Sequence, residues 1–224
     1  EVREAMAKHT TRHDRPTTPE FSDELQPALE AQVVEVADEI AYNNHDLDDG
    51  LTARLITREE LSQLEVWARA AAEVERHSPG LPPRIRDRQI IVFLINWQTT
   101  DLVSTTSARL ADAAIGDADA VRAAGHRLFA FSDELTRPKA ELESFLYERL
   151  YRHYRVVRMT TKARRFVREL FQAFLAAQRQ LPDEFRAAAA AEGAHRGICD
   201  YIAGMTDRYA QDEYKKLFYP FERV

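Results

Sequence analysis

One stretch of the sequence carries polar side chains at a spacing suited to chemistry. It runs from Leu29 to Gly50, and apolar residues at helical spacing mark one side of it as buried. Asp38, Tyr42 and Asp46 follow one another at intervals of four residues, so on a helix they form one line along a single face. Carboxylates can hold a cation or accept a hydrogen bond from a ligand hydroxyl. We therefore expect this line of side chains to face a cavity that binds a ligand.

The end of this stretch permits a second interpretation. Asp46, Asp48 and Asp49 fall in its last turn, where a carboxylate opposes the helix dipole at a cost of about 0.3–1 kcal/mol. A bound cation or ligand hydroxyl would offset that cost. Alternatively, Asp48 or Asp49 caps a following helix over residues 51–56. The pair His45–Asp46 also suggests metal ligands, but neighbouring helical residues point about 100° apart and rarely bind one ion together.

Charge is distributed unevenly along the chain. Residues 1–50 contain 13 acidic and four basic residues, whereas residues 149–168 contain eight basic residues and no acidic one. This polarity suits a ligand that carries both metal ions and phosphates, although two solvated helix faces also explain it. The basic residues of the second segment are Arg149, Arg152, Arg155, Arg158, Lys162, Arg164, Arg165 and Arg168.

Helices must position all of these side chains. Strong helix formers dominate the composition, and no segment shows the sustained alternation of a strand. A capping box at Thr57 and Glu60 opens one helix, and Pro82–Pro83 opens another. No segment after the proline-rich stretch 15–27 resembles a linker, so we expect one all-helical unit over residues 1–224. The predicted helices cover residues 29–50, 57–77 and 83–115, a short helix that ends before 125, a helix to about 151 that follows Ser132–Glu134 and Pro138, and then residues 156–180, 182–193, 195–210 and 211–218.

Composition excludes several classes of protein. With 45% hydrophobic and 30% charged residues, the chain is not disordered. A formal net charge of −6 argues against general nucleic-acid binding. Cys199 is the only cysteine, which excludes a disulfide scaffold and favours the cytoplasm. No apolar run approaches the roughly 20 residues that span a bilayer.

Six blocks stand in order along the chain and cover nearly all of it: Val2–Thr10, Ala37–Tyr42, His45–Gly50, Phe145–His153, Leu170–Phe171 and Tyr201–Ala210. Together they resemble the deoxyguanosine triphosphate triphosphohydrolases, which belong to the HD superfamily of metal-dependent phosphohydrolases. The resemblance implies an all-α, multi-helix fold like the C-terminal part of an HD-domain enzyme. We expect Ala203 and Gly204, in the last block, to allow close helix packing.

The resemblance also implies an activity and roles for individual residues. The family cleaves a deoxynucleoside triphosphate to a deoxynucleoside and inorganic triphosphate, with a divalent metal that we expect to be Mg²⁺ or Mn²⁺. It assigns Asp38 as one of four metal ligands and places substrate contacts at Tyr42 and Asp46. Tyr42 would pack on the sugar and exclude a 2′-hydroxyl, and Asp46 would accept a hydrogen bond from the 3′-hydroxyl. Tyr151 matches a family tyrosine that contacts the sugar or the phosphates.

Part of the family's metal site has no counterpart in this sequence. A His and a later His-Asp pair supply three of the family's four ligands, upstream of the block that starts here at Glu1, and His45–Asp46 is a different pair. We therefore expect the chain to be the C-terminal portion of an enzyme and to be inactive alone. The alternative is a non-catalytic helical module that binds nucleotides or nucleic acid and regulates a partner.

The basic segment and the C-terminus suggest further partners. Guanidinium and ammonium groups suit phosphate oxygens, and we expect phosphate contacts from Arg152, Arg155 and Lys162; a solvated or subunit-facing surface is the alternative. The family implies a homo-oligomer, from dimer to hexamer, and an allosteric nucleotide or single-stranded DNA as a further ligand. An aromatic-rich end could serve a subunit interface through Tyr214, Phe218, Tyr219 and Phe221.

Overall fold

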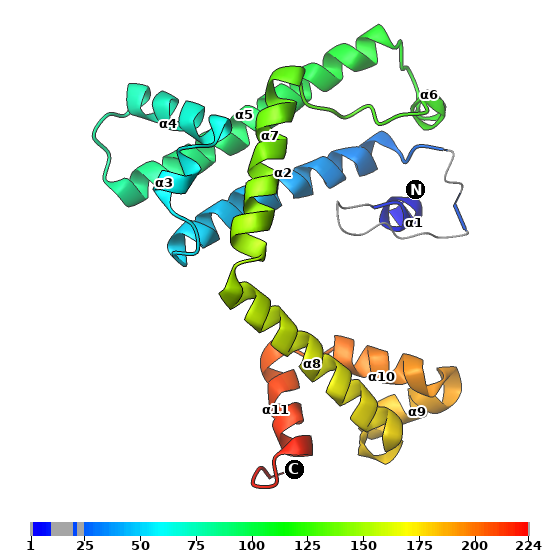
Figure 1. Ribbon diagram of the computed structural model, residues 1–224. Helices are drawn as coiled ribbons and strands as arrows, with labels where there is room; N and C mark the ends of the chain where they lie inside the picture. Colours follow the sequence, from blue (N-terminus) through cyan, green and yellow to red (C-terminus); the bar gives the residue numbers. More distant parts are fainter. Residues whose placement is uncertain (1, 10–19, 22–24, 224) are drawn as a thin grey trace. The chain divides into compact units, whose positions relative to one another are not determined.

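The computed structural model describes residues 2–9, 20–21 and 25–223, and these residues form helices joined by short loops without any strand (Figure 1). This confirms the all-α fold class. The sequence predicts a single unit over residues 1–224, whereas the contacts divide the chain into two compact units, Glu1–Arg152 and His153–Val224. None of the described helices combines the length and the apolar character that crossing a bilayer requires.

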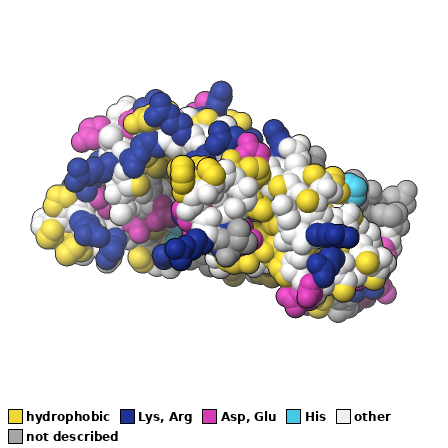
Figure 2. Space-filling model, turned by 90° about the horizontal axis from the view of Figure 1, so that it is seen from below, with side chains coloured by type: hydrophobic (Ala, Val, Ile, Leu, Met, Phe, Trp, Pro, Cys, Tyr) yellow, Lys and Arg dark blue, Asp and Glu magenta, His cyan; other side chains and the backbone are white. Residues whose placement is uncertain are grey.

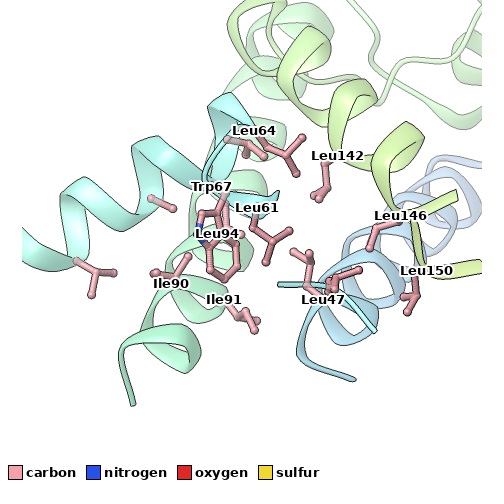
Figure 3. Close-up of a cluster of buried hydrophobic side chains, with 14 of the residues drawn as sticks. Leu47, Leu61, Leu64, Trp67, Ile90, Ile91, Leu94, Leu142, Leu146 and Leu150 are labelled. Carbon is pink, nitrogen blue, oxygen red and sulfur yellow. The ribbon is translucent and has the colours of Figure 1, made fainter. Parts of the chain in front are cut away.

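The first unit surrounds a core of leucine, isoleucine and tryptophan side chains (Figure 3). Leu47, Leu94 and Leu146, each from a different helix, are fully buried in this core. Asp38, Tyr42 and Asp46 are called the Asp38 line below. The helix that carries them packs against the longest helix of the chain and against a π-helix. The elements of this unit are α1 (Val2–Ala7), α2 (Leu29–Thr52), α3 (Arg58–Leu61), α4 (Glu65–His77), α5 (Pro83–Asp112), α6 (Ala118–Ala123), α7 (Asp133–Phe145) and the π-helix η1 (Leu146–Tyr151).

The second unit has a core of its own. Its longest helix, α8, packs against α10 and α11, and α9 packs closely against α10. Tyr214, which the sequence suggests for a subunit interface, is instead buried in this core, where its hydroxyl donates a hydrogen bond to Glu169. Phe218, Tyr219 and Phe221 are exposed, and their place in a subunit interface stays a prediction. The elements are α8 (Tyr154–Ala176), the 3₁₀-helix η2 (Gln178–Gln180), α9 (Asp183–Glu192), α10 (Ala194–Ala203) and α11 (Asp207–Phe218).

Several helix boundaries differ from the prediction because contacts distant in sequence or weaker local caps decide them. The capping box of Thr57 and Glu60 is present, but it opens only the short α3. Leu64 is extended, and α4 then begins with the Glu65 N–H bonded to the Glu141 carboxylate of α7 at 3.4 Å. The predicted helix over 51–56 is absent, because α2 continues to Thr52 and α3 begins at residue 58.

The second unit shows the same kind of difference. The predicted helix 195–210 ends at residue 203, because the Thr206 side chain accepts a hydrogen bond from the Tyr209 N–H at 3.2 Å and starts α11. Ala203 and Gly204 are exposed at this break, so the close packing predicted there was wrong. The glycine of close approach is Gly197, which is buried in α10 against α9.

Candidate functional site

Helix α2 holds the predicted line of side chains at the edge of the first unit. Leu47, Asn44 and Ile40 are buried on one side of the helix and fix its orientation. Asp38 and Tyr42 consequently lie on the exposed side, with 55% of Tyr42 accessible to solvent. Asp46, one turn further on, is half-buried.

Tyr151 meets this line from the π-helix η1. Its hydroxyl donates a hydrogen bond to Asp46 Oδ2, and its ring centroid lies 5.9 Å from that of Tyr42 at an interplanar angle of 41°. The π-helix is a wide turn whose N–H of Arg152 bonds to the Tyr147 carbonyl five residues earlier, at 3.2 Å. Such turns are frequent at functional sites. The structure therefore brings Tyr42, Asp46 and Tyr151 together, although they are up to 109 positions apart; their roles as substrate contacts stay predictions.

Burial shapes the electrostatics of this group. It raises the pKa of Asp46, assisted by Asp49 and opposed by the hydrogen bond from Tyr151 and by His45. Burial also raises the pKa of Tyr151 strongly, and the neighbouring Asp46 carboxylate and Tyr42 hydroxyl raise it further. The Tyr151 hydroxyl thus remains a hydrogen-bond donor throughout the neutral and moderately alkaline range.

This arrangement predicts how Tyr151 titrates. An unperturbed tyrosine ionises near pH ~10, whereas Tyr151 should keep its proton well above that pH. Because the folded-state pKa is the higher one, the stability that its hydroxyl confers is fully present below pH ~10 and is lost above it. Asp46→Asn removes the negative neighbour and should let Tyr151 ionise at lower pH, as measured by tyrosine ring-carbon NMR with Tyr151→Phe for assignment. Asp49→Asn serves as the control, and an equal shift in both variants would contradict the Asp46–Tyr151 bond.

The basic segment of residues 149–168 is divided between the two units. Arg149 pairs with Glu60 and Arg152 pairs with Glu148, so these two charges are partly neutralised within the first unit. Arg155 and Lys162 lie on α8 in the second unit, where both are exposed and the Lys162 ammonium lies 5.4 Å from the Phe166 ring centroid. Figure 2 shows Lys and Arg side chains interspersed with hydrophobic ones over one face of the molecule. Phosphate contacts by Arg152, Arg155 and Lys162 therefore stay predictions.

Two hollows in the described residues lie away from the Asp38 line. One, of about 490 Å³, follows α8 and is lined by Ala163, Arg164, Val167, Arg168 and Phe171. The other, of about 300 Å³, lies between α4 and α5. Neither hollow is lined by Asp38, Tyr42 or Asp46, so the expectation that these side chains face a cavity stays a prediction.

Known proteins match this chain over nearly its whole length. A family model described as a phosphohydrolase-associated domain matches residues 129–216. A "Deoxyguanosinetriphosphate triphosphohydrolase-like protein" of Bordetella pertussis is 50% identical over 222 residues, 97% of this chain and 57% of that protein. Proteins of the same name are 41% identical in Geobacter metallireducens (100% of this chain, 59% of that protein) and 44% identical in Azoarcus sp. (97% and 58%). This chain is a homologue of the deoxyguanosinetriphosphate triphosphohydrolase-like proteins. The predicted resemblance is thereby confirmed, and the chain spans less than three-fifths of the length of these relatives.

The described residues offer only part of the metal site that the resemblance implies. Asp38 is exposed and forms no hydrogen bond or ion pair with another described side chain, so its carboxylate is available as one oxygen ligand. No group of three or more His, Cys, Asp or Glu side chains in the described part of the chain could hold a metal ion. The described residues thus offer one candidate metal ligand, Asp38, and do not complete a coordination sphere.

Sequence reasoning missed a buried polar cluster behind the Asp38 line. Lys139 of α7 donates hydrogen bonds to Glu39 of α2 and to Glu143 of α7. Burial raises the pKa of Glu39, as does Glu143, whereas Lys139 acts in the opposite direction. The signal in the sequence was the pair Glu39 and Asn43, which repeats the i, i+4 spacing of Asp38 and Tyr42 one residue further along.

Proposed function

We propose that this chain is part of a metal-dependent phosphohydrolase that converts deoxynucleoside triphosphates to a deoxynucleoside and inorganic triphosphate. The homologues' names support a dGTPase-like activity. The observation that carries the proposal is that Tyr151 contacts both Tyr42 and Asp46, on the helix that also carries Asp38. The two tyrosine rings offer an aromatic surface for a sugar, and the Asp46 carboxylate can accept a hydrogen bond from its hydroxyl.

The proposed reaction requires a positioned sugar, a positioned water and neutralised phosphate charge. Water forms a bond to the α-phosphorus, the bond from that phosphorus to the 5′-oxygen breaks, and the deoxynucleoside leaves with a protonated 5′-hydroxyl. Asp38 would hold a divalent metal in part, and that metal would lower the pKa of the water and neutralise phosphate charge. Asp38 contributes one metal ligand, Asp46 accepts the 3′-hydroxyl hydrogen bond, and the Tyr151 hydroxyl orients Asp46. Holding the sugar in this way places the α-phosphorus at a fixed distance from Asp38.

Product analysis tests the proposal. The protein, extended to the length of its triphosphohydrolase-like relatives, is incubated with each deoxynucleoside triphosphate and Mg²⁺ or Mn²⁺. Anion-exchange chromatography should show deoxynucleoside and inorganic triphosphate in equal amounts. Formation of a deoxynucleoside monophosphate with pyrophosphate, or no turnover with either metal, would refute it. The 224 residues alone should be inactive, since no group of three or more possible metal ligands stands among the residues that the structure describes.

Tyr42 is expected to set the preference for deoxyribose. Tyr42→Ala removes the ring that would meet a 2′-hydroxyl, so the ratio of kcat/KM for dGTP over GTP should fall by about tenfold or more. Tyr42→Phe keeps the ring and should keep the ratio. Steady-state kinetics with both nucleotides measure it. A ratio unchanged in Tyr42→Ala would show that the ring does not contact the sugar.

A second candidate function rests on α8. Among the described residues no carboxylate pairs with Arg155, Arg158 or Lys162, and all three are exposed. Such a helix suits a nucleotide or a nucleic acid, as in a non-catalytic regulatory module. Salt separates the two functions: binding that follows a phosphate backbone weakens steeply with salt, whereas binding of a metal-held nucleotide depends chiefly on the divalent ion.

A further inference from the structure

Lys139 is one of the few charged side chains that the described part of the chain buries. Only 9% of its side chain is exposed, and its ammonium lies 5.1 Å from the ring centroid of Phe131. Its Nζ donates to Glu39 and Glu143, and Glu143 also accepts a hydrogen bond from Asn43 Nδ2 at 3.5 Å. One cation is therefore shared by two carboxylates contributed by two different helices.

The cluster lies beside the candidate site on the same two elements. Glu39 and Asn43 directly follow Asp38 and Tyr42 on α2. Glu143 lies on α7, which continues without interruption into the π-helix that carries Tyr151. Three polar contacts thus join the continuous α7–η1 segment to α2: Lys139 with Glu39, Glu143 with Asn43 and, further along, Tyr151 with Asp46.

Polar and apolar contacts between these two helices differ in how closely they fix the helices' relative position. Apolar packing such as that of Leu47, Leu146 and Leu150 is non-directional and tolerates small shifts of one helix along another. An ammonium shared by two carboxylates requires both of them to stay within reach of one buried point. The pairs it makes here are part-buried, with 42% of the Glu39 side chain exposed, and such pairs add little net stability. Its contribution is therefore to the register of the two helices more than to their stability.

We propose that Lys139 is a positioning residue, which fixes α7 against α2 through Glu39 and Glu143 and thereby places Tyr151 beside Asp46 and Tyr42. The effect on nucleotide binding rests on the proposed function, whereas the effect on Tyr151 does not. Lys139 itself touches neither the Asp38 carboxylate nor the Tyr42 ring in the contacts described here, so it acts through other residues.

The variants must separate positioning from stability. Lys139→Met alone leaves two carboxylates facing each other without their cation and is expected to destabilise the first unit. The triple variant Glu39→Gln, Lys139→Met, Glu143→Gln removes all three charges together and should remain folded. Lys139→Arg keeps the cation and is the rescue variant. Lys215→Met, which breaks an exposed pair with Asp212 in the second unit, is the matched control.

The first measurement is the titration of Tyr151 in the 224-residue chain, followed by tyrosine ring-carbon NMR. The triple variant should let Tyr151 ionise at lower pH and should weaken the ring contact with Tyr42. Lys139→Arg and Lys215→Met should leave both signals unchanged. A folded triple variant with an unaltered Tyr151 signal would overturn the proposal, as would an equal change in Lys215→Met. If the triple variant does not fold, an altered Tyr151 signal in Lys139→Arg overturns the proposal and an unaltered one supports it.

The second measurement is kinetic and uses the protein extended to the length of its relatives. Misplacing the sugar contacts should raise KM for dGTP by about 10- to 100-fold in the triple variant, with a smaller change in kcat. Lys139→Arg should restore KM toward the wild-type value. If the triple variant had an unchanged KM and a lower thermal stability, Lys139 would contribute to stability and would not position the sugar contacts. Absence of turnover in the wild type would refute the proposed function, while the Tyr151 titration would still decide the role of Lys139.

Discussion

Replacing Gly197 with alanine is expected to unfold the second unit at a much lower denaturant concentration than in the wild-type chain. A Cβ at this position would lie 2.7 Å from N, Cα and Cβ of Ala189, so the backbone of α9 must move away from α10. Overpacking of a core costs about 1–3 kcal/mol, and a backbone yields less readily than a side chain. Alanine gains about 1 kcal/mol over glycine within a helix. Because the clash is with backbone atoms, we expect a cost at the upper end of that range and a net loss of up to about 2 kcal/mol.

The two units allow this loss to be located. Both tryptophans, Trp67 and Trp97, belong to the first unit, so tryptophan fluorescence follows that unit while circular dichroism follows all helices. The Gly197→Ala variant should lose helical signal early and keep its tryptophan transition. Gly204→Ala is the control, because a Cβ there meets only Asp200 O at 3.4 Å and Tyr201 O at 3.6 Å. Equal stability of the two variants would contradict the close approach of α9 and α10.

Local signals in the sequence predicted most of the helices, and tertiary contacts decided the rest. The capping box at Thr57 and Glu60 is recognisable because all its partners lie within four residues. The cap at Thr206 is equally local, but Thr206 falls inside the helix that the sequence predicts over residues 195–210. The π-helix that carries Tyr151 buries Leu146 and Leu150, and no local pattern in the sequence predicts its wider turn.

Some features of the candidate site can likewise be predicted from local spacing, and others depend on residues distant in sequence. The spacing of Asp38, Tyr42 and Asp46 predicts one line because the helical period alone determines it. The bond between Tyr151 and Asp46 joins residues 105 positions apart, so only the resemblance to a family suggested that Tyr151 belongs there. The charge of the basic segment also depends on distant residues: the partner of Arg149 is Glu60, 89 positions away, and a count of neighbouring charges cannot include it.

Asp38→Ala is expected to abolish triphosphate release in the protein extended to the length of its relatives while leaving the fold intact. A metal supplies several kcal/mol of transition-state stabilisation, and losing about 4 kcal/mol slows turnover by about a thousandfold. Stability should change little, since the side chain is exposed and a surface substitution usually stays within about 0.5 kcal/mol. Triphosphate release and thermal unfolding, measured on the same preparation, check both expectations.

A second carboxylate of α2 provides the control for this prediction. Glu30 is also exposed but stands in the first turn of the helix, two turns from Asp38, so Glu30→Ala should keep full turnover. The same argument predicts that the 224 residues alone bind Mn²⁺ only weakly, because Asp38 is one ligand and no group of three stands among the described residues. Titration calorimetry measures this directly. Turnover retained in Asp38→Ala would show that Asp38 is not a metal ligand. Tight one-to-one Mn²⁺ binding by the 224 residues would show that they contain further metal ligands besides Asp38.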